Sequence, residues 1–394
     1  MPAVCGFTWA GVRTHVKDRG PDLALLLSDR PAHVAGVFTR STVPGAPVIV
    51  TRRRVRRGLA RAVVINAGIS NVAMGEQGLR DAEAMTQAVA DRLGLPVGQV
   101  LVASTGVIGE PLPMDKILPG IEKAARALGP ANISRAARAI MTTDTVPKVA
   151  TRAFRLGDAR CRVAGITKGS GMIEPNMATM LAFLATDAPV APDVLREIWR
   201  EVADDSFNRV TIDGEGSTSD MALLLANGAA GGRAIRSGRG AGAAALRDAL
   251  AGVAGDLAQA LARDGEGATK LVTVRVRGAR NDRDATHAAR RIANSLLVKT
   301  AIFGRDPNWG RILQTVGAGE IRLDLARTEV RLCGVPVFQK GASAGEAARL
   351  RAGKRLSRDE VEIAVDLGLG RSEARIWTCD LSYDYVRINA EYTT

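Results

Sequence analysis

The stretch best suited to chemistry runs from Lys168 to Leu181, KGSGMIEPNMATML, and places Thr179 directly after the small residue Ala178. A threonine hydroxyl is a poor nucleophile at neutral pH unless a base lies beside it. An N-terminal threonine carries that base, because its α-amine has a pKa of roughly 7.7–8.0 and accepts a proton near pH 7. We therefore expect the chain to cut itself between Ala178 and Thr179.

The same hydroxyl can begin the cut by attacking the carbonyl of Ala178, which gives an ester that water opens. A tight turn from Gly169 to Gly171 can hold the backbone for that attack. Taken alone, however, a glycine-rich turn that enters the apolar segment 177–185 is more often simply the start of a buried strand. Both interpretations stay open at the level of these residues.

A second candidate for chemistry is STGVIG, from Ser104 to Gly109, at the end of a predicted strand over 100–103. Backbone N–H groups at a strand end, together with the hydroxyl of Thr105, suit a developing oxyanion. The alternative is a plain turn from strand to loop. Two polar segments are less specific: 142–148 has the composition of a cap or turn, and 264–270 lacks the spacing of a phosphate-binding loop.

The chain of 394 residues has a net charge of +13, and its densest basic run is 52–57, RRRVRR. This run could touch nucleic acid or an acidic metabolite. Because no aromatic residue interrupts it and aromatic residues make up only 4% of the chain, we interpret it as a solvated edge or loop. A nucleic-acid-binding protein remains the rival from another functional class, and we expect no nucleic-acid partner.

The four cysteines are widely scattered and form no C-x-x-C pair, and the three histidines show no metal-ligand spacing. Free buried thiols and no metal site are therefore expected. No apolar run approaches the roughly 18 residues of a membrane helix, and no signal peptide is recognisable at the start. We expect a cytoplasmic protein without a membrane partner.

Apolar runs and periodicity predict an α/β chain. Strands are expected at 22–28, 44–51, 62–65, 100–103, 272–276, 329–332 and 361–365. A strand and turn are expected over 206–214, a turn at 66–68 and a hairpin over 151–163. Helices are expected at 78–93, 113–129, 134–141, 192–204 and 282–293, with a loop over 226–245 leading to another helix. A domain boundary near 280 would divide a catalytic domain, 1–280, from a smaller domain, 281–394.

The segment from Lys168 to Ala188, KGSGMIEPNMATMLAFLATDA, resembles the signature of the ornithine acetyltransferase family, the glutamate N-acetyltransferases of arginine biosynthesis. Members of that family process themselves before the threonine of this motif. The resemblance extends from about Gly36 to Thr394 and includes STGVIG, TTDTVPK and DGEGATK. It departs over 66–75, where Ile69 and Met74 replace polar residues, and over 213–220.

The resemblance implies acetyl transfer from N-alpha-acetyl-L-ornithine to L-glutamate through an acetyl ester on Thr179, in a ping-pong sequence. It implies an oxyanion hole made by Thr105 and Gly106. It also implies substrate contacts from Thr145, Lys168, Thr179, Glu266, Asn389 and Thr394. No cofactor is implied, and whether acetyl-CoA serves as a further acetyl donor is left open by the sequence.

The fold implied by the resemblance is a layered α/β sandwich of the type shared with self-processing aminopeptidases and amidases, with a smaller α+β C-terminal domain. The C-terminal tail would return to the active site. Processing would give an α chain, 1–178, and a β chain, 179–394, in a heterotetramer with two of each. The rival within the same mechanistic class is a self-processing aminopeptidase or amidase, which would pass the acyl group to water.

Overall fold

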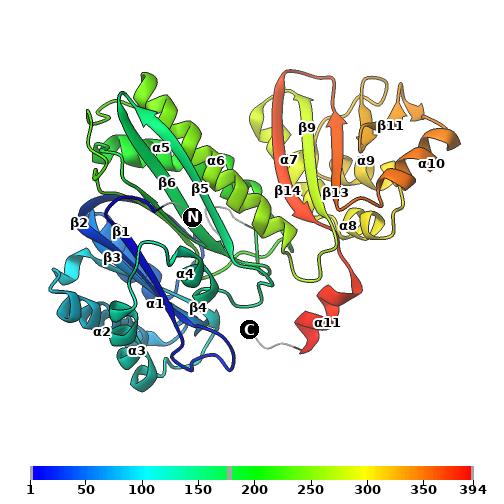
Figure 1. Cartoon of the computed structure of the whole chain (residues 1–394). Coiled ribbons are helices and arrows are strands. Elements are labelled where there is room, and N and C mark those ends of the chain that lie inside the picture. Colours follow the sequence, from blue (N-terminus) through cyan, green and yellow to red (C-terminus); the bar gives the residue numbers. More distant parts are fainter. Residues whose placement is uncertain (1–2, 175–179, 392–394) are drawn as a thin grey trace. The chain divides into compact units, whose positions relative to one another are not determined.

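A computed structural model describes residues 3–174 and 180–391 (Figure 1). The proposed cleavage site, Ala178 and Thr179, and the last residue, Thr394, lie outside these described residues. The chain forms two compact units, which we describe separately. The first comprises 3–208 and 215–261, and the second 209–214 and 262–391, counting described residues.

The first unit is built on one eight-stranded sheet with the order β4-β3-β2-β8-β7-β6-β5, and β1 pairs with β2 off this path. Its elements are β1 (Phe7–Val12), β2 (Leu23–Phe38), α1 (Ala46–Val55), β3 (Leu59–Ile69), α2 (Gly75–Leu93), β4 (Val100–Val107), α3 (Met114–Arg126), α4 (Ile133–Ala139), β5 (Lys148–Leu156), β6 (Ala159–Lys168), β7 (Leu181–Thr186), α5 (Pro192–Asp205), β8 (Met221–Ala226) and α6 (Ala241–Arg263).

Alternation along the strands divides the side chains of this sheet between two buried faces. One core joins β1–β4 to β6–β8, with α4 packed into it. A second core lies between β1–β4 and the helices α1–α3. In Figure 1, α1–α3 lie beside the blue strands, and α5 and α6 lie beside the green hairpin β5–β6. The layered α/β class predicted from the sequence is confirmed.

Strand β2 connects the two halves of the sheet. Its first part, from Leu23 to Leu27, pairs with β3, and its last part, from His33 to Phe38, pairs with β8. The register shifts between Leu27 and Ala32, which lets the strand change direction. A single long strand can therefore carry both halves of one continuous sheet.

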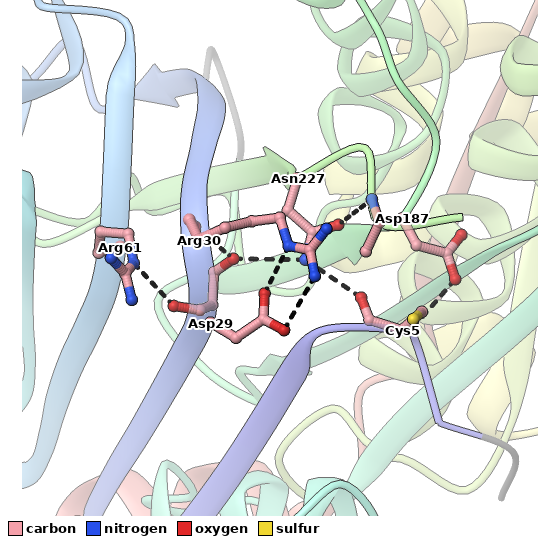
Figure 2. Close-up of polar contacts among 8 residues, drawn as sticks. Cys5, Asp29, Arg30, Arg61, Asp187 and Asn227 are labelled. Carbon is pink, nitrogen blue, oxygen red and sulfur yellow. Dashed lines mark hydrogen bonds and ion pairs between the residues drawn. The ribbon is translucent and has the colours of Figure 1, made fainter. Parts of the chain in front are cut away.

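The segment before β1 is tied to the ends of β7 and β8 by polar contacts (Figure 2). The backbone N–H of Cys5 donates to Asp187 Oδ2 at 3.0 Å, and Asn227 Nδ2 donates to the carbonyl oxygen of Cys5 at 3.1 Å. The Asn227 amide also donates to Ser28 Oγ at 3.3 Å. These contacts satisfy backbone groups that the sheet itself leaves unpaired.

The strand predicted over 44–51 is wrong, because this stretch begins helix α1. Its run of β-branched residues favoured a strand, but a short apolar run does not separate a buried strand from a buried helix. Pro47 lies in the first helical turn, where its missing N–H costs nothing, and Val48 and Val50 are buried. The turn predicted at 66–68 is also wrong, since these residues continue β3.

The basic run 52–57 was expected to be a solvated edge or loop, but one of its arginines is buried. Arg54 is only 6% exposed, and its Nη1 donates to the carbonyl oxygen of Val100 at 2.6 Å. Burial lowers the pKa of the Arg54 guanidinium, with a further contribution from neighbouring Arg53. The aliphatic stem packs while the charged end finds a backbone acceptor, so one arginine of the run serves the core.

Strand β8 was not predicted, and the strand predicted within 206–214 is wrong. Strand β8 is buried along its whole length and pairs in parallel with β7, so it lacks the alternation that marks an amphipathic strand. Residues 206–214 contain a short 3₁₀ helix, Phe207–Arg209, and a single bridge from Val210 to Trp377 instead of a strand. The hairpin predicted over 151–163 is confirmed as β5 and β6.

The second unit has a six-stranded mixed sheet with the order β12-β11-β10-β13-β9-β14. Its elements are β9 (Leu271–Ala279), α7 (Asp282–Asn294), α8 (Leu296–Phe303), α9 (Trp309–Gly317), β10 (Glu329–Leu332), β11 (Val335–Gln339), β12 (Ala342–Ser343), α10 (Glu346–Arg355), β13 (Glu360–Asp366), β14 (Ser372–Cys379) and α11 (Tyr383–Glu391). One core joins the sheet to α7–α10, and the predicted elements at 272–276, 282–293, 329–332 and 361–365 are confirmed.

None of the helices in the described part of the chain has an apolar stretch long enough for a bilayer.

A buried carboxylate organises the loop between β1 and β2. Asp22 is fully buried and accepts hydrogen bonds from the backbone N–H and hydroxyl of Thr14, at 2.6 and 2.9 Å. It also accepts from the N–H groups of Val16 and Lys17, at 2.9 and 3.1 Å. Because a carboxylate accepts all four bonds, the loop has one defined conformation.

Replacing Asp22 with asparagine should destabilise the protein by about 3 kcal/mol, because an amide nitrogen would face N–H donors that the carboxylate now satisfies. The thermal midpoint of the purified variant, compared with wild type, measures this. Asp18→Asn in the exposed part of the same loop is the matched control. Equal midpoints for the two variants would contradict the role assigned to Asp22.

Candidate functional site

The end of β4 has a geometry that only glycine can adopt. Gly106 has φ of +128°, and a Cβ there would lie 2.2 Å from the carbonyl carbon of Gly68 on β3. Gly68 pairs with Gly106 and itself has φ of +115°, and a Cβ on it would lie 3.0 Å from Lys17 Cγ. Two facing glycines therefore let the backbones of β3 and β4 and the loop holding Lys17 approach closely.

Two predicted site residues meet beside this glycine pair. Lys168, the last residue of β6, donates from Nζ to Thr105 Oγ1 at 3.1 Å, and Thr105 is 8% exposed. The ammonium group occupies a lone pair of the Thr105 oxygen, so the hydroxyl proton of Thr105 is available to another acceptor. The arrangement is a hydrogen-bond donor polarised by a positive charge, next to the backbone of Gly106.

The turn after Lys168 is held by a buried carboxylate that the sequence analysis did not single out. Asp144 Oδ1 accepts from the backbone N–H of Gly169 at 2.7 Å and from Lys148 Nζ at 2.6 Å. A second link joins Thr143 Oγ1 to Ser170 Oγ at 2.6 Å. Segment 142–148 is thus the support of the glycine-rich turn that precedes the proposed nucleophile.

The ion pair between Asp144 and Lys148 is buried, with side chains 0% and 1% exposed. Burial alone would raise the pKa of the Asp144 carboxyl, but the positive charges of Lys148 and Lys168 and the hydrogen bond from Gly169 outweigh it and lower the pKa. Asp144 is therefore held as a carboxylate. Burial lowers the pKa of nearby Lys17, against the opposing charge of Asp22.

A second buried acid lies at the start of β8. Asp220 is 2% exposed, and its Oδ2 has no hydrogen-bond partner among the described residues. Burial raises the pKa of Asp220 well above its usual range, although hydrogen bonds from Ser217 and the charge of Lys168 oppose the rise. The next residue, Met221, donates its N–H to the carbonyl oxygen of Met180 at 3.1 Å. Asp220 thus belongs to the framework around the start of β7.

In the second unit, two further predicted residues meet. Asn389 on α11 donates from Nδ2 to Glu266 Oε2 at 2.9 Å, and Glu266 is 8% exposed. At Gly267, where φ is +66°, a Cβ would lie 2.4 Å from the backbone nitrogen of Tyr385. Only glycine allows this approach of α11, so Gly267 positions Asn389 against Glu266.

The segment 264–270 is also tied to the end of β14. Asp380 is 1% exposed and accepts from the backbone N–H groups of Thr269 and Lys270, at 2.8 and 2.9 Å. Lys270 Nζ lies 3.6 Å from Asp380 Oδ2. The carboxylate therefore holds the loop in the way that Asp144 holds the turn in the first unit.

The structure brings together Thr105, Gly106 and Lys168 in the first unit, and Glu266 and Asn389 in the second. Thr145 is exposed on the segment next to Asp144. Ala178, Thr179 and Thr394 lie outside the described residues. Within the described part of the chain, no three His, Cys, Asp or Glu side chains are grouped so that they could hold a metal ion.

Asp144, Lys148 and Asp220 were not among the residues predicted for the site. An Asp and a Lys four residues apart carried a detectable charge-pair signal, but that spacing is usually read as a solvated helical pair. Here the two residues flank a bend at 145–146, and both side chains are buried. For Asp220 the sequence offered no signal, because a lone acid before an unrecognised strand looks like a turn residue.

Comparisons with known proteins agree with one another. A sequence model of the ArgJ family matches residues 8–394. The arginine biosynthesis bifunctional protein ArgJ of Geobacter sulfurreducens is 47% identical over 99% of this chain and 100% of its own length. The Thermus thermophilus protein of the same name is 46% identical over 99% of this chain and 98% of its own. The crystal structure of the Bacillus halodurans protein of that name is similar, with a TM-score of 0.52 and 39% identity, covering 54% of this chain and 100% of its own.

Replacing Asp144 with asparagine should destabilise the protein at pH 7 by about 3–5 kcal/mol, because buried Lys148 would lose the charge of this carboxylate. The pKa of Asp144 is lower in the folded than in the unfolded chain. Its stabilising contribution is therefore present above the unfolded pKa of about 3.9 and is lost as the pH falls through the folded value.

The difference in thermal midpoint between wild type and Asp144→Asn should accordingly shrink below about pH 4. Midpoints measured across a pH series test this, with Asp158→Asn in the exposed turn between β5 and β6 as the control. A difference that is constant in acid would show that the charge of Asp144 is not what stabilises the turn.

Proposed function

The chain belongs to the ArgJ family of arginine-biosynthesis acetyltransferases, and from that premise we propose that it transfers acetyl from N-alpha-acetyl-L-ornithine to L-glutamate through Thr179. The observation that carries the proposal is the pairing of Thr105 with Lys168 beside Gly106. It offers a charged, preorganised donor group at the end of β6, directly before the glycine-rich turn 169–171.

In the first half of the reaction, the Thr179 hydroxyl attacks the acetyl carbonyl carbon and its α-amine takes the proton. The oxygen of the tetrahedral intermediate becomes an anion, which the Thr105 hydroxyl and the Gly106 N–H stabilise. Lys168 strengthens the Thr105 donor by polarising its oxygen. The C–N bond then breaks, the α-ammonium returns the proton to the leaving amine, and ornithine departs from the acetyl ester.

In the second half, the amine of glutamate attacks the ester and takes the acetyl group, and Thr179 recovers its hydroxyl. The steps need neither a metal nor a bound organic cofactor. Acetyl-CoA could load the same hydroxyl with its thiol as the leaving group, in line with the word bifunctional in the relatives' names. The rival aminopeptidase or amidase would differ in one measurable respect, namely acyl transfer to water in preference to glutamate.

Substrate recognition in this proposal uses complementary charge. Lys168 would bind a substrate carboxylate, and Glu266 a substrate ammonium. Asn389 supports Glu266 through the 2.9 Å hydrogen bond and leaves one carboxylate oxygen available. Thr145 and the terminal Thr394 complete the proposed contacts.

We further propose processing between Ala178 and Thr179 into an α chain of 178 residues and a β chain of 216 residues, two of each forming the assembly. The similar Bacillus halodurans chain is matched over its full length while covering only 54% of the present chain. That share is close to the 216 of 394 residues that follow the proposed cut, which supports it.

Wild-type protein should migrate as fragments of about 19 and 23 kDa, estimated in proportion from 41.4 kDa, and the larger should begin with Thr179. Thr179→Ala lacks the attacking hydroxyl and should remain one chain of 41.4 kDa without activity. Denaturing gels and N-terminal sequencing provide the measurement. Cleavage of the alanine variant at the same bond would rule out self-processing by this residue.

Thr105→Val removes one donor to the oxyanion while keeping the shape of the side chain. We expect kcat for N-acetylornithine to fall by about 10²–10³-fold, the usual effect of losing one such donor, with KM changed much less. Thr105→Ser keeps the hydroxyl and is the control. Initial rates measured with N-acetylornithine and glutamate give kcat and KM. A valine variant whose kcat lies within twofold of wild type would show that Thr105 is not part of the oxyanion hole.

A further inference from the structure

A large basic groove lies in the first unit, away from the residues assigned so far. It has a volume of about 1030 Å³ and is lined by the end of β2, by α1 and by α5. Ligand pockets for small molecules commonly measure about 300–1,000 Å³, so the groove has room for a ligand of nucleotide size. The basic run that the sequence analysis interpreted as a solvated edge forms part of its wall.

The charge of this groove is strongly one-sided. Five arginines line it, Arg40, Arg52, Arg56, Arg196 and Arg200, against the single acid Glu197. Two of the arginines have partners: Arg52 Nη2 donates to the carbonyl oxygen of Thr39 at 2.7 Å, and Arg196 pairs with Asp193.

The other three arginines are available to a ligand. In the described part of the chain, the guanidinium groups of Arg40, Arg56 and Arg200 have neither an ion-pair partner nor a hydrogen-bond acceptor, and all three are exposed. Unpaired arginines that converge on one hollow suit phosphate, because a guanidinium group binds phosphate oxygens through two parallel hydrogen bonds.

The groove reaches the framework of the proposed nucleophile. Its wall includes Phe38 and Thr39, and Phe38 pairs with Met221 at the start of β8. Met221 in turn donates its N–H to Met180, the residue next to Thr179, at 3.1 Å. Strands lie about 4.8 Å apart, so the Phe38 wall is roughly two strand spacings, about 10 Å, from the backbone that follows Thr179.

We propose that this basic groove binds the phosphate groups of a nucleotide-sized ligand, and that this ligand is the 3′-phosphoadenosine diphosphate part of acetyl-CoA. The second half of the statement rests on the proposed function, in which Thr179 accepts acetyl groups. An acetyl thioester anchored by its phosphates in the groove would extend its acyl end toward the start of β7. The acetyl carbonyl would form an ester with Thr179, and the CoA thiol would leave with the proton.

The test uses 3′-phosphoadenosine 5′-diphosphate as the probe and the purified, processed protein. Calorimetric titration should give saturable binding that weakens as salt is raised. The variant Arg56→Gln/Arg200→Gln should raise the Kd of the probe and the KM for acetyl-CoA by about tenfold or more, because two charge-assisted contacts are lost. The KM for N-acetylornithine should be unchanged.

The matched control is Arg80→Gln/Arg92→Gln on α2, which removes the same charge outside the groove and should change the Kd less than twofold. Equal weakening by both variants, or no saturable binding of the probe, would overturn the groove as a phosphate site. If inorganic pyrophosphate bound as tightly as the probe, the groove would recognise phosphate alone, and the assignment of a nucleotide ligand would be wrong. If wild type transfers acetyl from N-acetylornithine to glutamate but the probe does not bind, only this inference fails, whereas loss of that transfer refutes the proposed function.

Discussion

The buried carboxylate of Asp144 is the interaction on which the site in the first unit depends. It accepts the N–H of Gly169 at 2.7 Å and pairs with Lys148 at 2.6 Å in a place that water does not reach. Because these groups are shielded from water, their contacts are strong. For the same reason, removing one partner strongly destabilises the folded protein. The turn that leads into the proposed nucleophile therefore has a fixed start, as self-cleavage at one peptide bond would require.

The same physical device recurs elsewhere in the chain. Asp22 gathers the N–H groups of the β1–β2 loop, and Asp380 gathers those of Thr269 and Lys270. In each place a buried acid satisfies backbone donors that no strand or helix can pair. The backbone of each of these loops is thereby held in one arrangement, and such support from neighbouring groups is what preorganises the side chains of a site.

Much of this fold could be predicted from the sequence where one face of an element is buried. The alternation of Val272, Val274 and Val276 correctly marked β9, and α2 was found from its apolar spacing. Where both faces are buried, as in β8, the alternation disappears, and in α1 a short run of β-branched residues did not separate strand from helix. The predictions for β8 and α1 failed because the spacing of apolar residues did not identify the element.

The candidate site divides in the same way. Thr105, Gly106 and Lys168 could be proposed because their motifs have specific residue types, and the contact between Lys168 and Thr105 now supports their joint role. Asp144 and Asp220 could not be proposed from the sequence, because their importance comes from burial and from partners distant in sequence. The basic run was identified correctly as a feature, but its place beside α5 depends on tertiary packing.

The central claim is that the hydroxyl of Thr179 carries the acetyl group between two substrates. The most direct measurement is the mass of the N-terminal peptide of the β chain after the enzyme meets N-acetylornithine without glutamate and is quenched in acid. The account predicts one acetyl group on the Thr179 side-chain oxygen, removed when glutamate is added before the quench. An active, uncut enzyme whose Thr179 never carries acetyl would contradict it.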